Sequence, residues 1–209
     1  LLVNRTRLEE IKRATPQQSP TLTAARDDLL KTAGTLVNEA PSPISGDLKI
    51  PAFYTSERET QQRLTRQIRK DARIAHALAL AAAISGNPQY AAKSRDFLYA
   101  WVRALKRPVN GGHWWQVFWL EHRGDTPLVV TYSFPSFIYA FDLLKGEGLL
   151  DAAEVDEFRQ WLKPFVAYCG KEVFYKNNHH NWQALFLMCA AHALEDETLF
   201  QRAASFYRN

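Results

Sequence analysis

Helical periodicity runs through almost every apolar segment of this chain of 209 residues. In residues 21–37, for example, Leu22, Leu29, Ala33 and Leu36 recur at helical intervals and so lie on one side of a helix. No segment shows the convincing alternation of apolar and polar residues that a half-buried strand requires. The pattern therefore predicts an all-α fold and excludes one built on a large β-sheet.

Short turns and long loops alternate between the predicted helices. Gly86-Asn87-Pro88 and residues 146–151 are short turns, whereas residues 38–56 and 108–126 are long loops. Helices are expected over residues 5–14, 21–37, 56–85, 90–106, 126–144, 151–169 and 182–194, and a further helix runs from about residue 195 to the last residue. The helix over 126–144 is expected to kink or restart at Pro135.

This succession of helical hairpins favours an incomplete (α/α)n toroid, in which inner helices are apolar all round and outer ones are amphipathic. The segment Ile74–Ile84, almost entirely Ala, Leu and Ile, has the composition of an inner helix. A cleft is expected at the end that carries loops 38–56, 108–126 and 170–178. A globin-like or irregular helical bundle is the alternative.

Composition agrees with a single globular domain over residues 1–209. Hydrophobic residues make up 46% and charged residues 23% of the chain, which excludes bulk disorder. No apolar run approaches about 18 residues, so no membrane span is expected. Cys169 and Cys189 fall in apolar surroundings and are expected to be buried free thiols. Because the chain starts without Met and its last helix has no stop signal, we expect it to be the N-terminal portion of a longer protein.

Positive charge is concentrated in the first half of the chain. Residues 1–107 hold 18 Lys and Arg against 10 Asp and Glu, while the net charge of the whole chain is only +4. Arg63, Arg66, Lys70 and Arg73 share one helical face. Such a stripe suits an anionic partner or is a solvated outer face. Nucleic acid is disfavoured, since no aromatic or Gly-rich reading motif accompanies the stripe.

The most informative motif is Asn177-Asn178-His179-His180-Asn181-Trp182. Asn favours the first turn of a helix, where free N–H groups attract an anion. Asn and His there can bind a carboxylate, and His can also move a proton. The alternative is that Asn178 only caps the helix. No metal site is expected, because adjacent histidines point in different directions and no second ligand pair stands at i, i+4 spacing.

The Asn-Asn-His-x-x-Trp element resembles the alginate lyase superfamily of polysaccharide lyases. So do the opening Leu2-Val3-Asn4-Arg5-Thr6-Arg7-Leu8, the stretch Ser85-Gly86-Asn87-Pro88-Gln89-Tyr90 and the following Phe97-Leu98-Tyr99-Ala100-Trp101. This resemblance implies a lyase that cleaves a uronate-containing anionic polysaccharide, such as alginate or a polyglucuronate, by β-elimination. It gives Asn178 the role of neutralising the substrate carboxylate, and His179 that of neutraliser or base. The family's catalytic Tyr and Arg have no match here and are expected beyond Asn209.

Aromatic residues in the loops are the candidate sugar-binding groups. Trp stacks on the C–H faces of sugars, and Gln bonds their hydroxyls, which favours Trp114, Trp115 and Gln116 as substrate contacts; Trp119 belongs to the same loop. Tyr54 lies where the family often has a lid, Trp182 braces the site, and Arg66 represents the basic stripe. Tyr54, Tyr132 and Tyr175 are expected to be packing or substrate contacts rather than the acid.

These observations together predict a polysaccharide lyase that needs no cofactor and binds an anionic polysaccharide, but no nucleic acid and no membrane. Its expected compartment is secreted or periplasmic, since such polymers lie outside the cell. A non-catalytic carbohydrate-binding or scaffold domain of the same fold is the alternative. Glycoside hydrolysis is a third possibility, with Glu121 and Asp125 as the available carboxylates.

Overall fold

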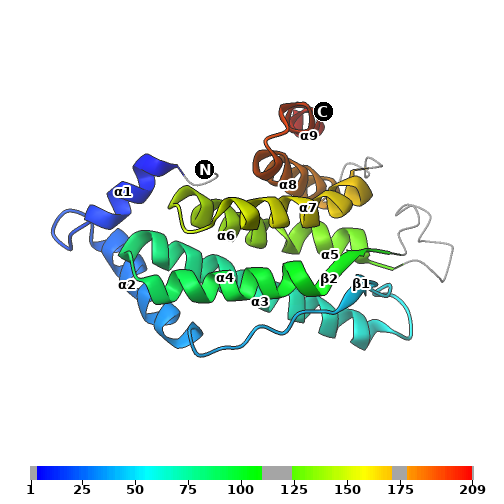
Figure 1. The fold of residues 1–209 in the computed structure, drawn as a ribbon, viewed down its shortest axis with the longest axis horizontal. Helices are drawn as coiled ribbons and strands as arrows, with labels where there is room; N and C mark the ends of the chain where they lie inside the picture. Colours follow the sequence, from blue (N-terminus) through cyan, green and yellow to red (C-terminus); the bar gives the residue numbers. More distant parts are fainter. Residues whose placement is uncertain (1–3, 110–123, 171–177, 209) are drawn as a thin grey trace.

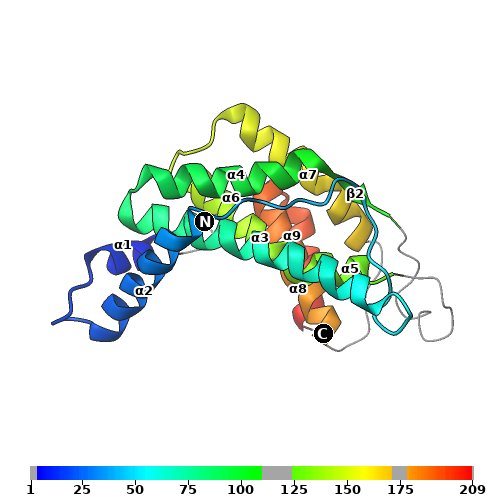
Figure 2. The same cartoon turned by 90° about the horizontal axis from the view of Figure 1, so that it is seen from below.

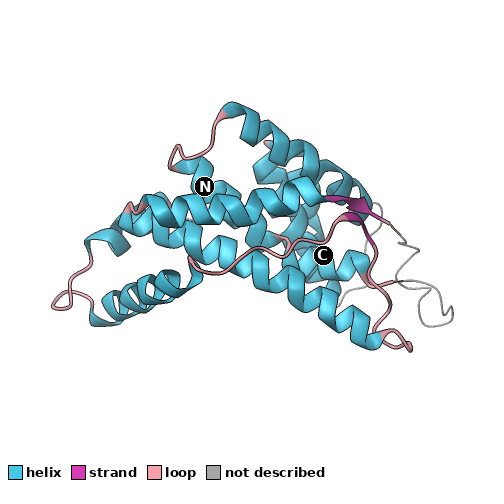
Figure 3. Cartoon of the chain, turned by 60° about the horizontal axis from the view of Figure 1, so that its bottom comes forward, coloured by secondary structure: helices cyan, strands magenta, loops and turns pink. Residues whose placement is uncertain are grey.

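The computed structural model describes residues 4–109, 124–170 and 178–208. Over these ranges the chain is helical apart from loops and two short strands (Figures 1 and 3). The helices are α1 (Arg5–Arg13), α2 (Pro20–Leu36), α3 (Arg58–Ser85), α4 (Pro88–Ala104), α5 (Thr126–Ser133), α6 (Pro135–Gly146), α7 (Ala152–Cys169), α8 (Asn178–Leu194) and α9 (Glu197–Arg208). The prediction of an all-α fold is confirmed.

Local sequence signals set several helix ends where they were expected. Gly86 ends α3 with a left-handed φ of 69°, and the Asn87 side chain then accepts a hydrogen bond from the backbone N–H of Gln89 to cap α4. Asp151 and Glu154 form a capping box at the start of α7. Pro135 separates α5 from α6, as predicted.

Two layers of helices form an open arch. The inner helices α3, α6 and α8 pack side by side in that order, while α4 and α7 cover their outer side. Figure 2 shows the arch with α1 and α2 at one foot and α8 at the other. The two layers agree with the predicted incomplete toroid.

The core lies between these layers. Phe134, Phe137 and Phe165 are fully buried, and the ring of Phe134 stacks on Trp161 with centroids 5.3 Å apart. The Ala-rich part of α3 is buried on most of its circumference, as its composition predicts. Cys169 and Cys189 are both buried and free, which confirms that expectation.

A small sheet is the main feature that the sequence did not predict. Strands β1 (Gly46–Leu48) and β2 (Leu105–Pro108) pair in parallel, and Val109 donates its N–H to the carbonyl of Leu48. Strands of three and four residues are too short to show alternation. The other difference is the start of α8, which lies at Asn178 rather than Trp182.

From the sequence, no segment is expected to be long and apolar enough to cross a membrane. Judged by length and hydropathy alone, that expectation is wrong. Residues Thr126–Gly146 meet both criteria, yet 78% of the window is buried inside the fold and the segment is broken at Pro135. A buried core helix meets the same criteria, so this segment is only weak evidence for a membrane span.

Candidate functional site

A hollow of about 320 Å³ lies where the inner helices meet. Its lining comes from α3, α5, α6 and α8, and consists of Arg69, Arg73, Tyr132, Ser133, Ser136 and Trp182. Three separate parts of the sequence, α3, the consecutive helices α5 and α6, and α8, thus converge on one polar site. The inner-helix packing is what brings these side chains together.

Three side chains form a row across the hollow. The guanidinium of Arg69 lies 5.4 Å from the ring centroid of Tyr132, and the Tyr132 ring meets the Trp182 ring edge-on at 6.3 Å. Burial raises the pKa of the Tyr132 phenol, so the phenol keeps its proton at neutral pH. Trp182 is 40% exposed, which leaves its ring accessible to a ligand. The row thus combines a cation, a phenol donor and a flat apolar surface.

The hollow carries an excess of positive charge. Arg69 and Arg73 stand one turn apart on α3, so both point to the same side of the helix. Neither forms an ion pair with a carboxylate in the described ranges, and no carboxylate from those ranges lines the hollow. An anionic ligand would therefore meet two uncompensated guanidinium groups here.

One hydroxyl in the lining has no partner. Ser133 is only 2% exposed, and its Oγ makes no hydrogen bond within the part of the chain that the structure describes. Leaving such a buried hydroxyl unpaired costs about 1–3 kcal/mol. A ligand hydroxyl or carboxylate in the hollow would offer it a partner.

Asn178 and His179 occupy the first turn of α8, four and three residues before Trp182. At about 100° per residue, both lie within roughly 60° of the Trp182 direction. Asn178 is exposed and His179 half-buried, and burial lowers the pKa of the His179 imidazole. A neutral imidazole is the form that can accept a proton. Helix geometry thus places both residues on the face of α8 that bears Trp182, although neither lines the hollow itself.

His180 lies on the other side of α8. It is buried, and its Nε2–H donates a hydrogen bond of 2.7 Å to the carbonyl oxygen of Phe206 in α9, since a carbonyl can only accept. The two adjacent histidines therefore have different surroundings.

The other predicted residues are scattered. Tyr54 is 94% exposed on the turn before α3, where its ring meets Phe53 edge-on, and it does not line the hollow. Arg66 lines a neighbouring groove instead. Trp114, Trp115, Gln116, Trp119, Glu121 and Tyr175 lie outside the described residues.

Asp125 is a candidate carboxylate for hydrolysis, but its hydrogen bonds indicate a structural role. Its Oδ2 accepts hydrogen bonds from the backbone N–H of Phe53 at 3.0 Å and from the Gln61 amide at 3.1 Å. Burial raises the pKa of its carboxyl group. Asp125 thereby anchors the turn that carries Tyr54 to the start of α5.

The neighbouring groove separates α2 from α3 and has a volume of about 640 Å³. Arg69 and Arg73 line this groove as well as the hollow, so the two depressions adjoin at these side chains. The basic stripe was predicted from the sequence, but the residue expected to contact substrate was Arg66 rather than Arg69. The i, i+4 spacing of Arg69 and Arg73 could have shown that these two residues share a helical face. It does not show which other helices that face meets.

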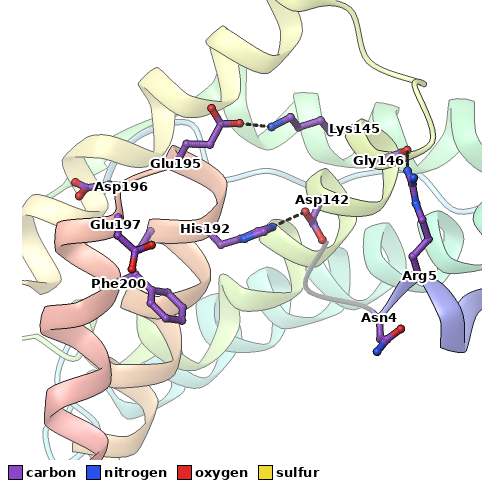
Figure 4. A pocket seen from close by; sticks show the side chains of 11 residues that line it. Asn4, Arg5, Asp142, Lys145, Gly146, His192, Glu195, Asp196, Glu197 and Phe200 are labelled. Carbon is purple, nitrogen blue, oxygen red and sulfur yellow. Dashed lines mark hydrogen bonds and ion pairs between the residues drawn. The ribbon is translucent and has the colours of Figure 1, made fainter.

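A third depression, of about 790 Å³, lies near the opposite end of α8 (Figure 4). Four of its ionisable side chains form two pairs. His192 contacts Asp142 at 3.1 Å, and Lys145 donates to Glu195 at 2.6 Å. Because these pairs connect α6, α8 and the turn before α9, we interpret this depression as a polar seam between helices. Within the described ranges, no group of three or more His, Cys, Asp or Glu is arranged to hold a metal ion.

Comparisons with known proteins agree with this architecture. The family model described as alginate lyase matches residues 49–209 of the chain. The chain superposes on an alginate lyase from Bacteroides ovatus with a TM-score of 0.72 and 17% identity, covering 96% of this chain and 62% of that one. For alginate lyase A1-III from Sphingomonas species A1 the TM-score is 0.68, with 19% identity and coverage of 97% and 56%.

A variant of alginate lyase A1-III complexed with a tetrasaccharide gives a TM-score of 0.67 at 19% identity, covering 96% of this chain and 55% of that one. A search of curated proteins finds no match. At these identities the structural likeness shows the fold, an incomplete α/α toroid as predicted. The chain spans 55–62% of the length of the solved structures that it matches.

Proposed function

Because this chain belongs to the alginate lyase family, we propose that it is the catalytic domain, or part of one, of a polysaccharide lyase acting on a uronate polymer. The observation that carries the proposal is the cationic hollow with Arg69, Arg73 and Trp182, beside the first turn of α8. An acidic sugar offers both a carboxylate for the guanidinium groups and a C–H face for the indole.

The proposed reaction is a β-elimination. A base removes the C5 proton, the electrons of that bond form the C4–C5 double bond, and the C4–O4 bond breaks. Proton loss adds negative charge to the uronate carboxylate, so groups that stabilise this charge lower the barrier. Asn178 would donate its amide N–H to the carboxylate. His179 would stabilise the same group or accept the C5 proton, and its lowered pKa favours the neutral form that a base requires.

The leaving O4 oxygen must receive a proton. The family resemblance places this role on a Tyr and assigns an assisting Arg, neither of which we match within these 209 residues. Tyr132 lies in the hollow and keeps its proton. We assign it to substrate contact.

The test is ultraviolet absorbance from the unsaturated uronate ends that elimination creates. Alginate, its separated mannuronate and guluronate blocks and polyglucuronate are each incubated with the full-length protein that contains this chain, and polymer binding is measured in parallel by titration calorimetry. We expect absorbance to rise with at least one polymer. Binding without any product would contradict the lyase proposal.

A carbohydrate-binding domain without turnover is the second candidate. Arg69, Arg73 and Trp182 suffice to hold an acidic sugar, and none of them needs to transfer a proton. Binding that persists after His179→Ala, with no product from either protein, would support this candidate.

A further inference from the structure

We propose that the groove between α2 and α3 binds a second stretch of the same acidic polymer, so that one polymer strand continues from the hollow across Arg69 and Arg73. This inference rests on the proposed function, because it takes a uronate polymer as the ligand. It adds a binding region that the hollow itself does not contain.

Continuity between the two depressions is the first argument. Arg69 and Arg73 line both of them, and the remaining walls come from α2 on one side and from α5, α6 and α8 on the other. A strand that pairs a carboxylate with Arg73 in the hollow therefore has the groove directly beside it. The groove is about twice as large as the hollow, at about 640 against 320 Å³.

Charge is the second argument. Arg66 and Arg73 are exposed and form no ion pair with any carboxylate in the described part of the chain. Lys70 is paired with Glu39 at 2.7 Å, and Glu39 is the one acidic residue among the described residues that line the groove. Three guanidinium groups from Arg66, Arg69 and Arg73 thus face one carboxylate that already has its own cation.

Asp71, the buried carboxylate that follows Lys70 in the sequence, has its hydrogen-bond partners outside the groove lining. Asp71 is fully buried and accepts hydrogen bonds from the indole N–H of Trp101 at 2.8 Å and from the backbone N–H of Ser42 at 2.6 Å. It therefore faces α4 and the segment after α2. The groove keeps its net positive charge.

The floor of the groove is the third argument. Leu36 and Ala77 are partly buried and Ile74 is buried, so apolar surface lies between the cations. Sugar rings have flat C–H faces and polar edges, and they fit apolar floors with polar rims. A uronate strand would use both the cations and the apolar floor. A free small anion would use only the cations, so the groove matches the uronate strand better.

Length dependence of binding tests the inference. Titration calorimetry compares a uronate disaccharide with an octasaccharide, the longer ligand that the inference requires to extend from the hollow into the groove. We expect Arg66→Gln to weaken octasaccharide binding about fivefold or more, as the loss of a charged hydrogen bond would, and to change disaccharide binding less than twofold.

Arg63→Gln is the matched control. Arg63 is exposed on the same helix and carries the same charge, but it lines neither depression. We expect it to leave binding of both ligands unchanged within twofold. Ala77→Glu, which places a carboxylate on the groove floor, is expected to reproduce the effect of Arg66→Gln.

Two results would overturn the inference. One is equal loss of octasaccharide binding in Arg66→Gln and Arg63→Gln, because the attraction would then be a general effect of charge. The other is single-stranded DNA that binds as tightly as the octasaccharide with the same dependence on Arg66. Neither depends on product formation, so failure of the groove and failure of the lyase reaction are distinguishable.

Discussion

The imidazole of His180 donates a hydrogen bond of 2.7 Å to the backbone carbonyl of Phe206, and thereby ties the first turn of α8 to the last turns of α9. Its neighbour His179 lies on the face of α8 that bears Trp182. Two identical side chains that are adjacent in sequence thus have different surroundings, because one helical step turns them about 100° apart.

Substitution of the two histidines is expected to separate activity from stability. In the full-length protein that contains this chain, His179→Ala should lower lyase turnover about 10²-fold or more, the scale of losing a proton-transfer group, with a smaller change in stability than His180→Ala. His180→Ala should reduce turnover by less than about tenfold but lower the free energy of unfolding by about 1 kcal/mol, because it removes a buried imidazole and its partly buried hydrogen bond to Phe206. Initial rates and urea unfolding measure the two effects. A larger loss of turnover at His180 would show that the assigned register is wrong.

The unpaired hydroxyl of Ser133 is expected to matter for binding and not for folding. Ser133→Ala should leave the unfolding free energy unchanged or slightly higher, since it removes a buried group without a partner. It should also weaken uronate disaccharide binding a few-fold. Ser94→Ala is the control, because the buried Ser94 Oγ donates to the carbonyl of Ala75 at 2.7 Å and its loss should cost about 1 kcal/mol. Equal destabilisation by both variants would contradict this assignment.

Asp125 is expected to make stability depend on pH. Burial raises its folded-state pKa, so its contribution is fully present below the usual carboxyl pKa of about 3.9 and is lost as pH rises through the raised value. In Asp125→Asn an amide oxygen at the Oδ2 position can still accept both hydrogen bonds, from Phe53 and Gln61, but it does not ionise.

The wild-type chain should therefore lose stability relative to Asp125→Asn as pH rises from about 3 to neutrality. Urea unfolding of both proteins across this range measures the difference. A constant difference would show that the carboxyl group ionises as readily in the fold as in the unfolded chain, and a change in favour of the wild type with rising pH would show that it ionises more readily in the fold; either result would contradict the raised pKa.

The backbone of Glu195 is expected to be strained. Glu195 has a φ of 57°, in the left-handed region, and its carboxylate pairs with Lys145 and Arg159 from α6 and α7. Both Glu195→Gly and Glu195→Ala remove these ion pairs, but only Gly adopts this φ without cost. Glu195→Gly should therefore be about 1 kcal/mol more stable than Glu195→Ala in thermal or urea unfolding. Equal stabilities would mean that the turn changes conformation in the variants.

Much of the fold follows from local sequence. The Gly86-Asn87-Pro88 turn, the break at Pro135 and the capping signals around Asp151 act over a few residues, so they set helix ends without help from the rest of the chain. The apolar composition of Ile74–Ile84 likewise requires burial. The Asn178-His179 pair could be proposed from the sequence because the helix-start chemistry of Asn and the motif's resemblance to a family are both local.

Only the tertiary structure decides which side chains share the hollow. Arg69, Tyr132 and Trp182 belong to three helices, and their meeting depends on how α3, α5 and α8 pack, which no local pattern encodes. The same packing turns His180 towards Phe206 and joins the α2–α3 groove to the hollow at Arg73. Sequence periodicity determines which residues lie on one face of a helix, whereas the packing of the helices determines what that face meets.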